Sequence, residues 1–138
     1  MGRLLAIDHG DKRVGLAISD PNQIISKPLK TLFLSDLNFF FEKLLEIIND
    51  YKIEKLIIGL PLGMDGKRTQ QTKKVETFKV ELEKKIDIPI VMFDERLSSV
   101  SAKKSLISQG IKTGFNKSKI DQTAAAIFLQ HYLDSKNY

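Results

Sequence analysis

Four acidic residues stand at positions from which they could form one site: Asp8, Asp94, Glu95 and Asp121. Asp8 ends the first apolar run of the sequence, and Asp94 and Glu95 follow a later one. Asp121 lies near the start of the last amphipathic segment. Ligands of open α/β sheets bind beyond the carboxyl ends of the strands, and hard cations prefer oxygen ligands. We therefore predict a Mg²⁺ site suited to displacement at phosphorus, where two ions could clamp the attacking and leaving oxygens.

Each acid also has a purely structural interpretation. Asp8 could be a turn residue, and Asp121 could complement the dipole of a helix N-terminus. Either Asp94 or Glu95 could form an ion pair with Arg96. Side chains alternate between the two faces of a strand, so Asp94 and Glu95 cannot both face one cleft if the strand continues through them. The residues alone leave open which of the two faces the metal.

The net charge of +5 equals the charge of one segment, residues 97–120, which holds five lysines and no acid. A concentrated basic segment favours a polyanionic partner, most simply nucleic acid, although a solvated lysine-rich surface is the alternative. Basic side chains in predicted loops near strand ends could also contact phosphate. An ion pair with a neighbouring acid is the structural alternative for Arg13 and Arg96. The candidates for nucleic-acid contact are Arg13, Lys67, Arg68, Arg96, Lys103, Lys104, Lys117 and Lys119.

Several classes of protein are excluded by what the sequence lacks. Without cysteine there is no disulfide framework, thiol nucleophile or Cys-ligated zinc. Residues 59–68 fail as a Walker phosphate loop, because Pro61 stands where glycine is required and Arg68 where Ser or Thr is required. The longest nearly apolar stretch, residues 56–64, is far shorter than the ~20 residues of a membrane span. We expect a soluble, cytoplasmic protein with no membrane partner.

The elements that would position these residues can be predicted from apolar periodicity and from capping and turn residues. Two short apolar runs, 3–8 and 14–19, predict a β-hairpin. A third strand is predicted over 30–34, after the breaks at Pro21 and Pro28. Further strands are expected at 55–59 and 89–93, and helices from Ser35 or Asp36 to about 51, from 69 to about 86, from Ser98 or Ser99 to 110, and from about 118 to 133.

This order of elements predicts the fold class. Early strands joined by short connections should be antiparallel, and later strands joined through helices should be parallel with right-handed crossovers. We therefore expect a single α/β domain over residues 1–138, a three-layer sandwich whose mixed sheet has helices on both faces. Strand alternation points His9 to the side of its strand opposite Asp8, and we assign it no role.

Four short motifs occur in order along nearly the whole chain. They are Asp-x-Gly-x-x-Arg-x-Gly-Leu-Ala from Asp8, Gly-Leu-Pro from Gly59 with Asp65-Gly66, Asp-Glu-Arg-x-Ser from Asp94, and Lys-x-Asp-x-x-Ala-Ala from Lys119. Any one of these motifs is weak, but the four at this spacing are highly specific. Together they resemble the YqgF, or RuvX-like, family of pre-16S rRNA nucleases.

The resemblance implies an RNase H-like fold, shared with Holliday-junction resolvases of the RuvC type, and trimming of the 5′ end of the 16S rRNA precursor in the bacterial cytoplasm. It implies Asp8, Glu95 and Asp121 as the catalytic, metal-binding acids, with Asp94 as the alternate to Glu95. Mg²⁺ or Mn²⁺ would be the cofactor. The implied partners are structured RNA, in particular precursor rRNA, and ribosomal particles, for a monomer or a homodimer.

Three other functions remain as alternatives. A Holliday-junction resolvase acting on four-way DNA would use the same fold and metal chemistry, and would normally act as a dimer. A non-catalytic RNA- or ribosome-associated binding protein would bind RNA in a salt-sensitive way without cleaving it. Asp8-x-Gly10 also resembles the phosphate motif of actin-like sugar kinases, but those need two such domains and this length supplies one.

Overall fold

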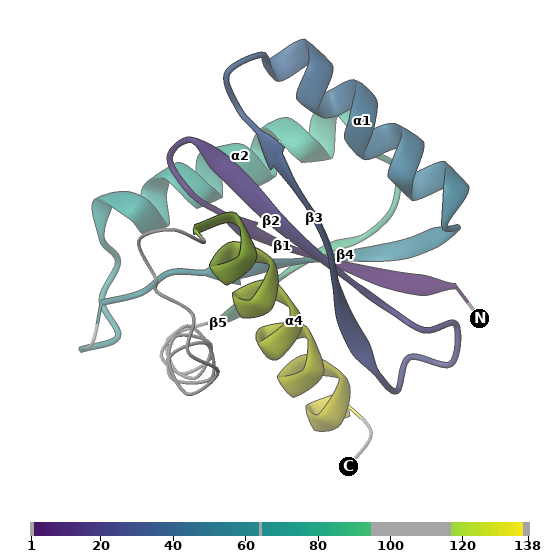
Figure 1. Cartoon of the computed structure of the whole chain (residues 1–138). Coiled ribbons are helices and arrows are strands. Elements are labelled where there is room, and N and C mark those ends of the chain that lie inside the picture. Colours follow the sequence, from purple (N-terminus) through teal and green to yellow (C-terminus); the bar gives the residue numbers. More distant parts are fainter. Residues whose placement is uncertain (1, 64, 95–116, 137–138) are drawn as a thin grey trace.

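The computed structural model describes residues 2–63, 65–94 and 117–136 (Figure 1). The helix predicted from Ser98 or Ser99 to 110 lies outside them. No helix within these ranges is both long enough and apolar enough to cross a bilayer. The described elements are β1 (Arg3–His9), β2 (Arg13–Ser19), β3 (Ser26–Phe33), α1 (Leu37–Asp50), β4 (Ile53–Leu60), α2 (Gln70–Lys85), β5 (Ile90–Asp94) and α4 (Lys117–Lys136).

The strands form one mixed sheet in the order β3-β2-β1-β4-β5. β2 is antiparallel to β1 and to β3, whereas β4 is parallel to β1 and to β5. The predicted hairpin, the early antiparallel strands and the later parallel strands are therefore confirmed. β3 begins at Ser26, earlier than the predicted start at Lys30, because Pro28 lies on an edge strand, where a residue without an N–H group is tolerated.

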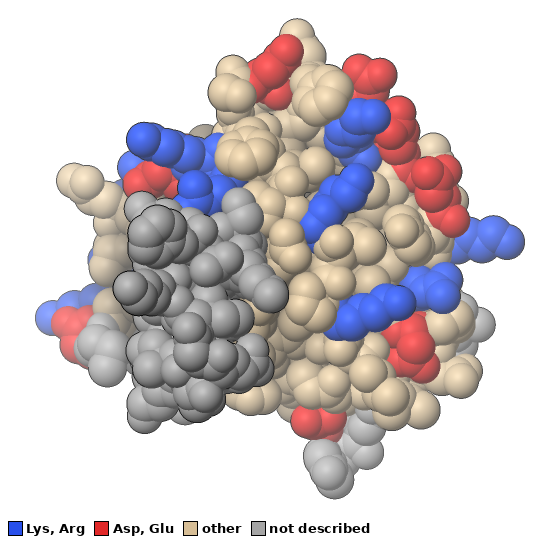
Figure 2. Space-filling model, in the orientation of Figure 1, with Lys and Arg blue, Asp and Glu red and all other residues tan. Residues whose placement is uncertain are grey.

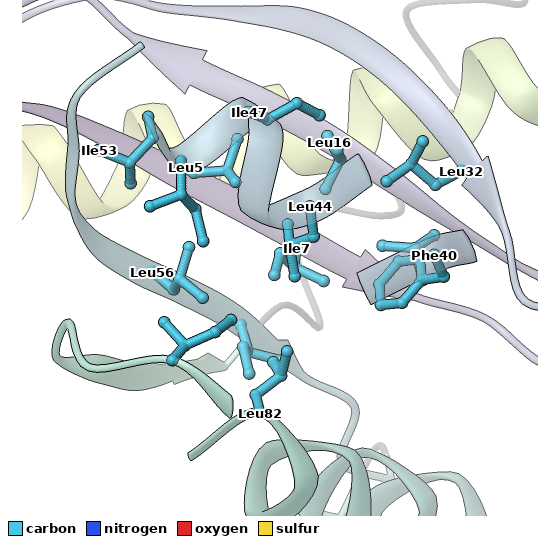
Figure 3. Packing of buried hydrophobic residues seen from close by; sticks show 14 of the residues in the cluster. Leu5, Ile7, Leu16, Leu32, Phe40, Leu44, Ile47, Ile53, Leu56 and Leu82 are labelled. Atoms are coloured by element: carbon cyan, nitrogen blue, oxygen red, sulfur yellow. The ribbon is translucent and has the colours of Figure 1, made fainter. Parts of the chain in front are cut away.

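Side chains alternate between the two faces of the sheet, and each face has its own apolar core. On one face the sheet packs against α1 and α2; this core includes Leu5, Ile7, Leu16, Phe40, Leu44, Leu56 and Leu82 (Figure 3). On the other face it packs against α4; this core includes Leu4, Ala6, Ala17, Ile57, Ala125, Phe128, Leu129 and Leu133. The three-layer α/β sandwich with helices on both faces is thus confirmed.

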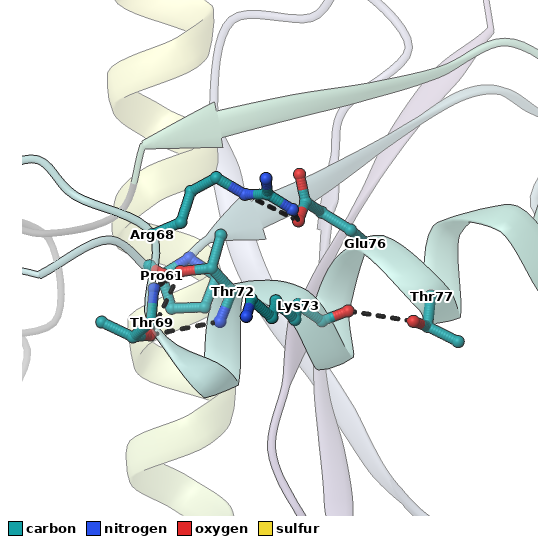
Figure 4. Close-up of polar contacts among 7 residues, drawn as sticks. All are labelled: Pro61, Arg68, Thr69, Thr72, Lys73, Glu76 and Thr77. Carbon is teal, nitrogen blue, oxygen red and sulfur yellow. Dashed lines mark hydrogen bonds and ion pairs between the residues drawn. The ribbon is translucent and has the colours of Figure 1, made fainter.

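The first two helices begin at residues whose side chains cap them. An Asp36 carboxylate oxygen accepts the N–H of Phe39 at 3.1 Å, at the start of α1. The hydroxyl oxygens of Thr69 and Thr72 each accept the other residue's N–H, at 3.2 and 2.9 Å, at the start of α2 (Figure 4). The Thr72 hydroxyl also donates to the carbonyl oxygen of Pro61, which joins the loop after β4 to α2.

Two groups of hydrogen bonds hold α4 against the edge strand β3. The Thr31 hydroxyl oxygen accepts the amide of Gln122 at 3.0 Å, near the start of the helix. Farther along the helix, the Ser26 N–H donates to Gln130 Oε1 at 3.0 Å, and the Ser26 hydroxyl donates to the carbonyl oxygen of Ala126. These contacts fix both the position of α4 along β3 and the face of the sheet that it covers.

Candidate active site at the carboxyl edge of the sheet

Asp8 and Asp94 lie at the carboxyl ends of parallel strands, as predicted. Ile7 of β1 is paired with Ile58 of β4, which is paired with Met92 of β5. Asp8 therefore lies one residue beyond this row, and Asp94 lies two residues beyond it. In sheets of this kind the carboxyl edge is where ligands bind.

Asp8 faces α4. Leu4 and Ala6 belong to the core under α4, and Asp8 follows them in the two-residue alternation of β1. The Asp8 side chain is half-buried. His9 points to the opposite face, as predicted, and its ring centroid lies 4.4 Å from that of Phe78 in α2.

Asp94 belongs to the opposite face from Asp8. Phe93, the residue before it, packs against α4, with ring centroids 6.4 Å from Phe128 and 5.9 Å from Tyr132. Met92 packs against the core under α1 and α2. Asp94 is exposed and, by alternation, shares the side of Met92. Of the adjacent pair, Asp94 is thus turned away from Asp8, while Glu95 lies outside the described residues.

The first turns of α4 lie over the row of Asp8. Asp8 is paired with Gly15 in β2, and Gly15 is paired with Thr31 in β3. Gln122 of α4 is bonded to Thr31, and Asp121 precedes it within the same helix. The backbone of α4 therefore brings residue 121 to the face and the level of Asp8; its side chain is outside the part that the structure describes.

Glycine flanks Asp8 on both sides. Gly15 is its partner in β2, and Gly59 stands at the next position of β4 after Ile58, where it pairs with Phe93. Neither neighbour places a side chain beside the carboxylate on the α4 face. The sequence shows both glycines, but only the register places them beside Asp8.

The predicted basic residues are distributed over several elements. Arg13 begins β2, where it is paired with Phe33. Lys67 and Arg68 lie in the loop after β4, and Arg68 forms an ion pair with Glu76 of α2 (Figure 4). This pair is exposed, and such pairs contribute at most ~1 kcal/mol, so a phosphate could replace the carboxylate. Arg96, Lys103 and Lys104 lie outside the described residues, and Lys117 and Lys119 are placed only as backbone in α4.

On the face shown in Figure 2, Lys and Arg side chains stand in separate groups with Asp and Glu between them. Within the described ranges, no group of three or more His, Asp or Glu side chains is close enough to hold a metal ion. Of the predicted acids Asp8, Glu95 and Asp121, only Asp8 has a described side chain.

A family model for RuvX, described as a Holliday junction resolvase, matches residues 2–135. The chain belongs to the RuvX family. A relative from Maridesulfovibrio salexigens is 44% identical over 131 residues, covering 95% of this chain and 97% of the relative. Another, from Roseiflexus sp., is 40% identical over 135 residues, covering 98% and 96%. Both are named "Putative pre-16S rRNA nuclease". The predicted family is confirmed, and this RuvX protein is a nuclease.

Solved structures confirm the RNase H-like fold of the RuvX chain. T. thermophilus RuvC in complex with a Holliday junction substrate has a TM-score of 0.57 at 14% identity, covering 99% of this chain and 96% of that one. Fowlpox virus resolvase in complex with Holliday junction DNA has a TM-score of 0.54 at 13% identity, covering 99% of each chain. Identities this low establish the shared fold alone.

Proposed function

We propose that this RuvX protein is a metal-dependent endonuclease that hydrolyses a phosphodiester bond at the 5′ end of the 16S rRNA precursor. The observation that supports this most directly is the position of Asp8. It is half-buried at the carboxyl edge, has glycine on either side, and belongs to the row of the sheet that the first turns of α4 cover. The names of the two relatives support precursor rRNA as the substrate.

We propose Asp8, Glu95 and Asp121 as the catalytic, metal-binding acids. Carboxylate oxygens are the donors that Mg²⁺ and Mn²⁺ prefer. Because Gly15 and Gly59 add no side chain on either side of Asp8, an ion there could keep water and phosphate oxygens as further ligands. Asp94 lies on the other face, which favours Glu95 as the residue of that pair. A bound ion would supply Lewis-acid stabilisation of the charge that develops on the phosphate.

The basic residues would hold the nucleic acid across this edge. Arg13 and Lys67 begin or follow strands that border β1, and a guanidinium can bind two phosphate oxygens at once. Arg68 would exchange Glu76 for a phosphate. Arg96 and the lysines at 103, 104, 117 and 119 would follow the backbone. We place this activity in one domain over residues 1–138, in the cytoplasm, acting on precursor rRNA or ribosomal particles as a monomer or homodimer.

The test compares Asp8→Asn with Asp87→Asn on precursor 16S rRNA in Mg²⁺ and in Mn²⁺. Asp87 is an exposed carboxylate in the turn before β5, away from the carboxyl edge, and serves as the matched control. Loss of a ligand should cost at least about 100-fold in cleavage rate, since even residues that only support ligands cost 10- to 100-fold. Asp87→Asn should cleave like the wild type. Wild-type rates for Asp8→Asn would refute the metal-site assignment.

Cleavage of four-way DNA is the second candidate function. The description of the family model and the fold shared with two resolvases favour it. The same proteins should be assayed on a four-way DNA junction and on a linear duplex of the same sequence. Preferential cutting of the junction, with slower cutting of precursor rRNA, would support a resolvase. Salt-sensitive RNA binding without cleavage of either substrate would instead support the non-catalytic binding protein.

A further inference from the structure

A pocket of about 560 Å³ lies on the α1/α2 face of the sheet, at the same edge as Asp8. Its volume falls within the roughly 300–1,000 Å³ typical of small-molecule sites. The β1–β2 turn lies beside α2 in Figure 1 and is joined to it by a bond from the Gln71 amide to the carbonyl oxygen of His9, at 3.3 Å. Among the lining residues are His9, Leu34, Leu37, Lys73, Lys74 and Thr77.

One part of the lining is formed by an aromatic ring and two leucines. The His9 imidazole packs on Phe78, at an interplanar angle of 43°. Leu34 is half-buried, whereas Leu37 leaves 55% of its surface exposed at the first position of α1. A planar ring beside an exposed leucine suits the face of a nucleobase.

Another part of the lining is basic. Lys74 Nζ lies 3.0 Å from Asp11 Oδ1, and both side chains are more than half exposed. Lys73 forms no ion pair with any described residue. The lining therefore has two lysines against one aspartate, an excess of positive charge beside an apolar surface. This combination is complementary to a base joined to a phosphate.

We propose that this pocket binds an unpaired nucleotide of the nucleic-acid substrate, with the base against His9 and Leu37 and its phosphate at Lys73. The proposal rests on the proposed nuclease function. Asp8 and His9 are consecutive and face opposite sides of β1, so a strand crossing the edge of the sheet can present a phosphate to Asp8 and a nearby base to the pocket. The substrate would then have unpaired nucleotides next to the cleaved bond, because a paired base is not free to enter.

The first experiment uses the wild-type protein in EDTA, so that its result is independent of cleavage. Adenosine 5′-monophosphate, uridine 5′-monophosphate, adenosine and inorganic phosphate are titrated separately while NMR signals are recorded. We expect either nucleotide to shift the Leu37 and Thr77 signals, the adenosine shift to be weaker, and Leu45 and Val80 to stay unchanged. Shifts with inorganic phosphate equal to those with the nucleotides would reduce the pocket to an anion site and overturn the proposal. Absence of shifts with either nucleotide would overturn it as well.

The second experiment measures the affinity for fluorescent single-stranded RNA and for a duplex of the same sequence, in EDTA at fixed salt. Leu37→Ala and Lys73→Gln are compared with Leu45→Ala on α1 and Lys84→Gln on α2, which change exposed side chains outside the pocket. Each pocket variant should bind the single strand at least about fivefold more weakly, because Leu37→Ala removes apolar surface that covers the base and Lys73→Gln removes a phosphate contact. The affinity for duplex should change by less than about twofold.

Equal weakening for single strand and duplex, or equal weakening by the control variants, would overturn the proposal. The outcome is separate from that of the nuclease assignment. If Asp8→Asn cleaves normally while the Leu37 and Lys73 variants lose single-strand affinity, the nucleotide pocket is supported and the metal-site assignment is refuted. If Asp8→Asn is inactive while these variants bind normally, the reverse holds.

Discussion

The packing of α4 on the sheet can be tested by a matched pair of substitutions, Phe128→Leu and Phe40→Leu. Both phenylalanines are fully buried, Phe128 between α4 and the sheet and Phe40 between α1 and the sheet. Leucine is smaller by roughly three carbon groups, each worth at most about 0.8 kcal/mol on burial. We expect each substitution to lower the free energy of unfolding by about 2 kcal/mol, as measured by urea denaturation.

The two variants should differ in activity although they lose similar stability. A domain that starts with at least about 5 kcal/mol keeps about 3 kcal/mol, which leaves more than about 99% of the molecules folded at 25 °C. Phe128 packs the helix that carries Asp121 against the sheet, and a misplacement of about 1 Å can cost up to about 100-fold in rate. We expect Phe128→Leu to cleave precursor rRNA at least about tenfold more slowly in single-turnover assays, and Phe40→Leu to stay within about twofold of the wild type.

A Phe128→Leu protein that loses stability but cleaves at the wild-type rate would show that the packing of α4 does not position the site. The same loss of activity in both variants would show that the cleavage rate depends on the overall stability of the fold rather than on the position of α4 against the sheet. Circular dichroism of each folded variant at the assay temperature provides the control for partial unfolding.

Two further predictions concern the turn between β2 and β3 and the start of α4. The Asp20 carboxylate accepts the N–H groups of Ile25 and Ile24, which holds its pKa below the ordinary value of 3.8. The ionised Asp20 carboxylate stabilises the fold fully above pH 3.8, and this stabilisation is lost as the pH falls toward the lower folded pKa. The wild type should therefore lose its stability advantage over Asp20→Asn in urea titrations below about pH 4. An advantage that stays constant with pH would contradict this. Thr31→Val and Gln122→Met should each lower the free energy of unfolding by about 1 kcal/mol, and the double variant should lose little more than either; fully additive losses would show that the two side chains act independently.

Most of the fold follows from local signals in the sequence. The caps at Asp36 and Thr69 and the apolar periodicity behind them predict α1 and α2 within a few residues. The sequence predicts only the second half of β3, because Pro28 indicates the end of a strand unless that strand is known to lie at the edge of the sheet. Edge positions are decided by the order of strands in the sheet, and this order depends on long-range packing.

The candidate site was predictable in its position but not in its detail. Local patterns place Asp8 and Asp94 at strand ends and put His9 on the side opposite Asp8. That Asp94 faces away from Asp8 could not be predicted from the sequence, because it follows from the packing of Phe93 against α4. The pocket at His9 required the contact between the β1–β2 turn and α2, a pairing of residues far apart in the chain, such as Asp11 with Lys74, that no local pattern indicates.

The glycines on either side of Asp8 restrict how such a protein can diversify. With Gly15 and Gly59 as neighbours, only main chain lies beside this carboxylate in β2 and β4, so neither strand offers a side chain in this row whose exchange could alter the site. Substrate preference must then be adjusted in the loops next to this row, such as the β1–β2 turn and the loop carrying Lys67 and Arg68. An engineer seeking a new preference should vary those loops and leave the glycine-flanked row intact.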